Sequence, residues 1–119
     1  MLPRTPEGMY ALLEQGIDKY SIYYDNAKDI VFDRITETLN TTIDYSDVQI
    51  IANYMLLIVY EKIRDEFIST YDVLVDDIGI RSYKSQVDAK ETAIEMQNQK
   101  IQKLLLKLSD NFDVVDDII

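Results

Sequence analysis

Seven consecutive apolar residues, Tyr54–Tyr60, constrain the fold of this chain more than any other feature. A helix that is apolar on every side is buried on every side. The stretch therefore predicts a central element that is covered by the rest of the chain or by another subunit. A buried β-strand could also use seven apolar residues. The charged residues that follow Tyr60 and the helix-start pattern that precedes Tyr54 favour the helix.

The predicted start of this central helix is a capping box. In such a box Gln49 would reach back to the backbone amide of Ser46, and the Ser46 side chain would cap the free amides of the first turn. We expect the helix to run from Asp47 to about Tyr71, or as far as Ile78.

The first 40 residues predict one long amphipathic helix. Thr5 suits the N-cap position and Pro6 suits the first helical position. Small or apolar residues then recur every three or four positions as far as Thr38, which keeps them on one face of a helix. If unbroken to Asn40, this helix would be about 50 Å long, and Gly16 is the place where it could kink.

Apolar residues spaced seven apart indicate a third helix, from Ser82 or Ser85 to about Leu108. Two of the alternate seam positions are polar, so the seam is weaker than that of a coiled coil. The helix either closes its own bundle or lies against a neighbouring copy. The heptad positions are Val87, Ile94, Ile101 and Leu108, and the alternate positions are Lys90, Gln97 and Leu104.

These patterns predict an all-α fold. An elongated bundle of three main helices occupies residues 1–108, and a short acidic and apolar C-terminal tail without a helical period occupies residues 109–119. The chain has three glycines and two prolines, and sheet-rich folds need more of these turn residues.

The absent residue types narrow the chemistry. The chain has no cysteine and no histidine, which excludes disulfides, thiolate zinc sites and the commonest general base. Neither a phosphate-cradling motif nor an EF-hand spacing occurs. We therefore expect a protein that is not an enzyme, with no catalytic residues, no cofactor and no metal site.

Charge and hydropathy bear on partners and location. The net charge of −10 argues against direct nucleic-acid binding, because phosphates repel an acidic protein. The longest apolar stretch is far shorter than the roughly 20 residues of a membrane span, and no secretory leader pattern opens the chain. We expect an intracellular (cytoplasmic) protein, or one packaged in a virus particle.

Four carboxylates at intervals of four residues would form a ladder on the first helix, opposite its apolar stripe. They are Asp25, Asp29, Asp33 and Glu37. Like charges at this spacing destabilise a helix by about 0.2–0.5 kcal/mol per pair, so the ladder has a small cost. It could imitate a row of phosphates, meet a basic partner surface, or be an ordinary solvated face.

Three further groups of side chains are candidates for binding a protein partner. Ile22 and Phe32 would project toward the acidic face of the first helix. Residues 81–107 carry six basic and three acidic side chains, a net charge of +3, and could meet the acidic first helix of another copy. The tail combines aspartates with apolar side chains, which suits docking on a partner. The residues chosen in the last two groups are Lys100, Lys103, Lys107, Phe112, Val115, Ile118 and Ile119.

The function that the sequence favours is a non-catalytic structural or assembly role. The chain would be a small helical subunit of a larger complex, such as a connector subunit of a viral or phage particle, and would bind copies of itself or other proteins. One alternative is an acidic inhibitor that imitates nucleic acid and occupies a nucleic-acid-binding enzyme. A second alternative is a regulatory adaptor that acts through its C-terminal tail.

Overall fold

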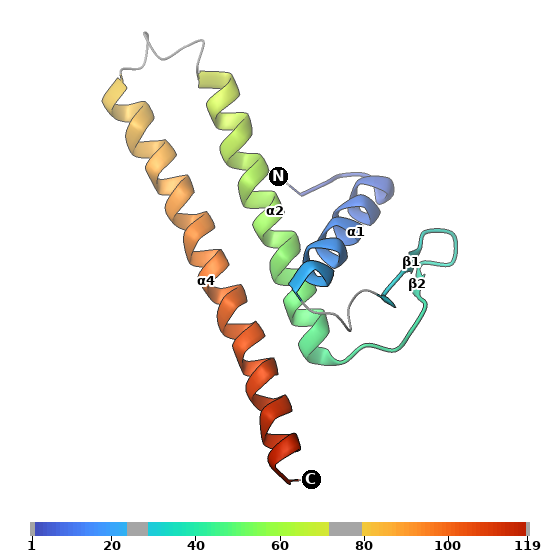
Figure 1. Cartoon of the computed structure of the whole chain (residues 1–119). Coiled ribbons are helices and arrows are strands. Elements are labelled where there is room, and N and C mark those ends of the chain that lie inside the picture. The colour runs from blue at the N-terminus through green and yellow to red at the C-terminus, as the bar shows by residue number, and fades with distance from the viewer. Residues whose placement is uncertain (1, 24–28, 72–79, 119) are drawn as a thin grey trace.

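The computed structural model describes residues 2–23, 29–71 and 80–118, with the side chains of residues 71, 80, 81 and 109–118 left undescribed (Figure 1). Its helices are α1 (Pro6–Tyr23), α2 (Tyr45–Tyr71) and α4 (Ile80–Ile118). Between α1 and α2 the chain forms an antiparallel hairpin of two short strands, β1 (Phe32–Asp33) and β2 (Thr38–Leu39). The predicted all-α class with three main helices is confirmed.

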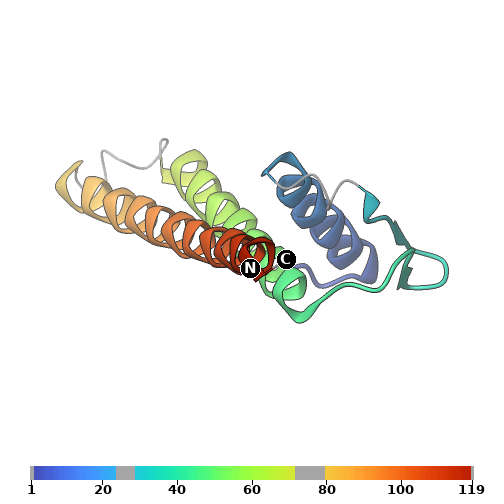
Figure 2. The ribbon, with the colours of Figure 1, turned by 60° about the horizontal axis from the view of Figure 1, so that its bottom comes forward.

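Helix α2 is central, as predicted. Helices α1 and α4 each pack on it, and α4 runs antiparallel to it (Figure 1). In two views the hairpin lies beyond α1, on the side away from α4 (Figures 1 and 2). The radius of gyration is 18.0 Å and the dimensions are 63 × 38 × 18 Å, whereas a compact chain of this length has a radius of gyration of about 14 Å. The molecule is therefore elongated and flattened.

The first turns of α1 and α2 are capped by side chains. The Gly8 amide donates to Thr5 Oγ1 at 3.1 Å, so Thr5 is the cap predicted for α1. Helix α2 begins two residues before the expected Asp47. Its cap is Asp44, whose amide donates to Asp47 Oδ2 at 3.2 Å. The capping box predicted at Ser46 is wrong, because the helix already begins at Tyr45 and the carboxylate of Asp47 accepts from the amide of Asp44.

Helix α2 buries apolar side chains in two clusters. Ile58 and Val59 pack against Leu12 of α1 in a small cluster. A larger cluster joins α1, α2, α4 and the residues around the hairpin. This larger cluster consists of Ile17, Tyr20, Ile30, Ile50, Ile51, Tyr54, Leu57, Ile94 and Ile101. Neighbours therefore cover most of the apolar stretch Tyr54–Tyr60, but Leu56 is 36% exposed, so the expected burial on every side is not met within the chain.

Gly16 marks the closest approach of α1 to α2. A Cβ atom at this position would lie 2.8 Å from Met55 Cγ and 3.2 Å from the carbonyl oxygen of Ile51. Both distances are shorter than an ordinary van der Waals contact. The glycine expected to kink the helix instead lets two helices pack closely.

The seam of α4 packs on α2 of the same chain. Gln97 is only 6% exposed, and its Nε2 donates to the backbone oxygen of Asn53 at 3.0 Å and to Asn53 Oδ1 at 2.9 Å. Nearer the α2–α4 connection, the rings of Phe67 and Tyr83 stack with centroids 5.8 Å apart. The Lys90 ammonium lies 4.3 Å from the Phe67 ring centroid, so both polar seam residues have a partner on α2.

The first helix is much shorter than predicted. It ends at Tyr23 instead of Asn40, and the hairpin follows. The physical reason is composition: eight of the fourteen residues 30–43 are β-branched. Such side chains lose rotamer freedom in a helix and fit an extended backbone well. The preference of these β-branched residues for extended backbone outweighs the helical spacing of apolar residues such as Val31 and Ile35.

The last helix is longer than predicted. Helix α4 begins at Ile80, two residues before Ser82, and continues through Ile118. The expectation that the chain leaves helical conformation after Leu108 is therefore wrong. The aspartates of the predicted tail and its apolar residues up to Ile118 lie in helical backbone, and Ile119 lies outside the described residues.

The packing at Gly16 predicts a position-specific loss of stability. Gly16→Val should lower the free energy of unfolding by about 1–3 kcal/mol, because the added atoms overpack the α1–α2 contact. Gln15→Val places the same side chain at the adjacent exposed position and should cost less than about 1 kcal/mol. Urea unfolding followed by circular dichroism measures both. Equal midpoints would show that α1 does not approach α2 closely.

Candidate interaction surfaces

The acidic ladder predicted on the first helix does not exist as a helical row. Asp25 lies outside the described residues. Asp29 precedes the hairpin, Asp33 ends β1, and Glu37 lies in the turn with φ of 57°. These three carboxylates are exposed, but they follow a tight chain reversal. Their spacing of four residues therefore does not produce an evenly spaced line of charge.

The hairpin that carries these carboxylates is held in place by side-chain hydrogen bonds. Asn40 donates to the Asp29 carbonyl at 2.7 Å and accepts from the Val31 amide at 2.8 Å. Asp33 accepts from the Ile35 amide at 2.9 Å, which closes the turn. These bonds fix both the base and the tip of the hairpin.

Helix α1 also supports the hairpin. Arg34 pairs with Glu14 of α1, and the Tyr10 ring of α1 contacts the Phe32 ring with centroids 5.5 Å apart. The pKa of Tyr10 is raised, mainly by a hydrogen bond to the Glu37 carboxylate and to a smaller extent by burial. Phe32 packs against the core, so the prediction that it projects from an acidic helical face is wrong.

The tip of the hairpin presents an apolar side chain to solvent. Ile35 is 94% exposed, although the turn around it is fixed by hydrogen bonds. The sequence interpretation missed this residue because it placed Ile35 on the apolar stripe of a helix. The density of β-branched residues between Ile30 and Ile43 could have indicated the hairpin.

The other predicted partner-binding residues fall into two groups. Ile22 is exposed at the end of α1, and the side chains of Lys100, Lys103 and Lys107 are exposed on α4. These four are available to a partner. The side chains of Phe112, Val115 and Ile118 and the whole of Ile119 lie outside the described residues.

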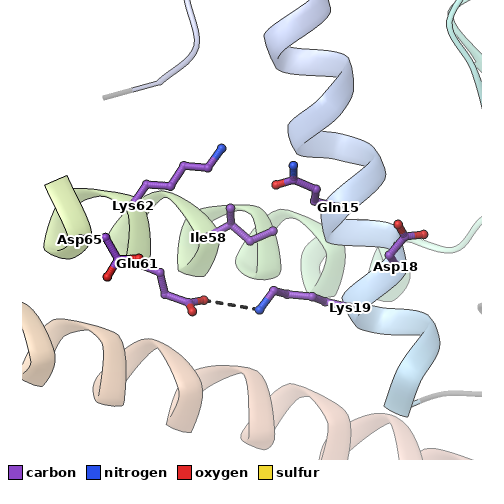
Figure 3. Close-up of a pocket in the computed structure, with 7 residues that line it drawn as sticks. All are labelled: Gln15, Asp18, Lys19, Ile58, Glu61, Lys62 and Asp65. Carbon is purple, nitrogen blue, oxygen red and sulfur yellow. Dashed lines mark hydrogen bonds and ion pairs between the residues drawn. The ribbon is translucent and has the colours of Figure 1, made fainter.

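A shallow groove separates α1 from α2 (Figure 3). Its volume is about 350 Å³, and Lys19 of α1 reaches across it to Glu61 of α2, with Nζ and Oε1 3.5 Å apart. Both side chains are partly exposed, so this ion pair adds little stability. The groove is lined by Gln15, Asp18, Lys19, Ile58, Glu61, Lys62 and Asp65. None of these residue types is a hydroxyl, thiol or imidazole nucleophile or base.

A second cavity lies where α1, α2 and α4 meet, with a volume of about 140 Å³. Tyr23 and Tyr54 contribute to its wall, and their rings stack with an interplanar angle of 4°. Tyr54 is 3% exposed, and its hydroxyl has no hydrogen-bond partner within the described part of the chain. Burial, with a smaller contribution from Tyr23, raises the pKa of Tyr54 to about 12.

A metal site and a membrane-spanning helix are both absent from the described part of the chain. Among the side chains that the structure describes, in residues 2–23, 29–70 and 82–108, no cluster of three or more acidic groups is arranged to hold a metal ion. Within the same residues, no helix combines the length and the hydropathy needed to cross a membrane.

Two buried tyrosines should respond oppositely to loss of the hydroxyl. The Tyr20 hydroxyl donates to Asp47 Oδ1 at 2.6 Å and so joins α1 to the start of α2. Tyr20→Phe should lower the free energy of unfolding by about 1.5–3 kcal/mol, because a hydrogen bond to a charged group is lost. Tyr54→Phe removes an unpaired hydroxyl and should leave stability unchanged or raise it by up to about 1 kcal/mol. Denaturant titration of both variants checks this, and equal losses would show that Tyr54 has a partner.

The pKa of Tyr54 predicts a loss of stability at high pH. In the unfolded chain a tyrosine ionises near pH 10, whereas in the folded chain Tyr54 ionises at about 12. The folded state therefore keeps the Tyr54 proton to a higher pH than the unfolded state does. The contribution of Tyr54 to the free energy of unfolding is complete below pH 10. The free energy of unfolding should fall by up to about 3 kcal/mol as pH rises from about 10 to about 12. Unfolding titrations across that range should show a shallower fall in Tyr54→Phe, and parallel curves would contradict the assignment.

Comparison with known proteins identifies the family. Residues 1–110 match the family model described as YomZ prophage protein. The SPbeta prophage-derived uncharacterized protein YomZ of Bacillus subtilis (strain 168) is 21% identical over 113 residues, which cover 93% of this chain and 83% of that protein. No solved structure matches significantly. Since the family model spans nearly the whole chain, the protein belongs to the YomZ prophage protein family.

Proposed function

We propose that this chain is a non-catalytic structural subunit of a phage-encoded assembly. The prophage family agrees with the phage origin expected from the sequence. The structural role rests on one observation, the amount of surface that the folded chain leaves uncovered. The chain has an accessible surface of 8532 Å², and a compact monomer of 13.9 kDa exposes about 6,700 Å².

The excess surface follows from the open arrangement of the helices. Helices α1 and α4 pack on α2 but make little contact with each other. The side of each helix that faces away from α2 is therefore not covered by the other helix. Large apolar side chains remain exposed on α1, α2, α4 and the hairpin, including Ile22, Ile35, Val48, Met96 and Leu106. Exposed apolar surface on this scale is typical of proteins that are covered by partners.

The composition supports a role without catalysis. The chain has neither histidine nor cysteine, and the groove between α1 and α2 brings together carboxylates, ammonium groups and an amide. Such a set provides hydrogen bonds and ion pairs for a protein surface, and it lacks the activated nucleophile and base of most acyl-transfer sites.

The proposal of nucleic-acid mimicry loses its main support. It required evenly spaced carboxylates along one helical face, and the chain turns back on itself at Asp33 and Glu37. The adaptor hypothesis assigned docking to an acidic and apolar tail without a helical period, and residues 109–118 are helical. The assembly role is the one that the open fold favours.

The native mass of the chain tests the assembly role. Sedimentation velocity over a range of concentrations should give a species whose mass is a multiple of 13.9 kDa, because association would cover the surplus surface. The same measurement on particles purified after prophage induction should find the chain in a fixed ratio to a phage protein. A chain that stays monomeric when concentrated and is absent from those particles would refute the proposal.

A further inference from the structure

Two opposite sides of the molecule differ in charge. The hairpin lies beyond α1, and α4 lies on the other side of α2 (Figures 1 and 2). Residues 29–40 carry three carboxylates and Arg34, and Arg34 is already paired with Glu14 of α1. Residues 96–108 of α4 carry three lysines and no acidic residue. The acidic residues and the basic residues are therefore on different elements, which lie on opposite sides of the molecule.

The acidic side is preorganised for contact. Asp29, Asp33 and Glu37 are exposed around the hairpin, and Ile35 stands at its tip with 94% of its surface in solvent. The hydrogen bonds of Asn40 and Asp33 fix this segment before any partner arrives. An interaction made by a fixed loop loses less conformational entropy on binding than one made by a flexible loop. We name this region the hairpin edge.

The basic side is the outer face of α4. At 100° per residue, Lys100, Lys103 and Lys107 fall within about 60° of one another, and all three are exposed. The buried seam residues Gln97 and Ile101 point toward α2, roughly 120° away from the lysines. Met96 and Leu106 add apolar surface to the same outer face, with 64% and 63% of their areas exposed. We name this region the lysine face.

We propose that the hairpin edge of one copy docks on the lysine face of the next copy. This inference rests on the proposed assembly role and names its interface. Opposite charges would steer and orient the contact, and Ile35 would pack among the apolar side chains beside the lysines. Since the two surfaces differ, the contact is heterologous, and repeated contacts give a ring or a filament instead of a closed two-fold dimer.

The surface area fits this arrangement. The chain exposes roughly 1,900 Å² more than a compact monomer of its mass. A standard interface buries about 800 Å² on each partner. In a head-to-tail series each copy contributes two such patches, or about 1,600 Å². The surplus of the whole chain is therefore comparable with the area of two standard patches.

Paired variants test the interface on the full-length chain. Lys103→Glu with Lys107→Glu disables the lysine face, and Asp29→Lys with Ile35→Ser disables the hairpin edge. Lys62→Glu with Lys84→Glu is the matched control, because it changes the net charge as much as the first variant, at exposed positions outside the two surfaces. All of these side chains are exposed, so circular dichroism should show unchanged helicity.

Sedimentation at low salt should show association of the wild-type and control chains. The lysine-face variant and the hairpin-edge variant should each associate about tenfold more weakly or worse. An equimolar mixture of the lysine-face variant and the hairpin-edge variant should form a dimer and nothing larger. The intact hairpin edge of the first can dock on the intact lysine face of the second, and no further surface is left. Raising salt from about 0.05 M to about 0.5 M should weaken the wild-type contact.

The outcomes separate the two proposals. The proposed interface is wrong if both the lysine-face variant and the hairpin-edge variant associate as the wild type does. It is also wrong if their mixture stays monomeric. Either result leaves the assembly role standing. Ile35 is not part of the core, so Ile35→Ser alone should not disturb the fold. If this single change has no effect on association, the hairpin tip is not part of the contact. A wild-type chain that is monomeric in every condition overturns both proposals.

Discussion

The fold depends on covering α2, whose apolar surface is wider than one neighbouring helix can bury. Leu12 of α1 covers Ile58 and Val59, while Leu57 belongs to the larger cluster shared with α4. A charge placed at a position such as Leu57 would be buried without a partner. The positions of α1 and α4 are therefore a consequence of α2, and the open outer sides of both helices follow from it.

Polar groups and one small residue set how the covering helices sit. Apolar contact alone would permit α4 to slide along α2, because hydrophobic burial is not directional. The two hydrogen bonds from Gln97 to Asn53 specify one register. At the opposite side, Gly16 fixes the point where α1 approaches α2, and the bond from Tyr20 to Asp47 fixes the end of the same contact.

The sequence was sufficient to predict elements whose determinants are local. The Thr5 cap and the all-α class depend on neighbouring residues and on helical periodicity, and the structure confirms them. The hairpin was missed because Val31 and Ile35 satisfy a helical spacing that their β-branched shape opposes. Gln97 looked like a flaw in the seam, since its partner lies 44 residues away and periodicity carries no information about such a contact. The exposed Ile35 tip and the unpaired Tyr54 hydroxyl depend on tertiary structure in the same way.

The antiparallel pairing of α2 with α4 has a consequence for how the chain folds. Their contacts include residues as close in sequence as Phe67 and Tyr83, so little loop-closure entropy opposes them. The contact of Gly16 with Ile51 closes a much longer stretch of chain. Helices α2 and α4 can therefore form a nucleus on which α1 and the hairpin dock last. By the same order in reverse, α1 is the unit that can detach while the other two helices remain folded, which would leave Ile58 and Val59 transiently open to water.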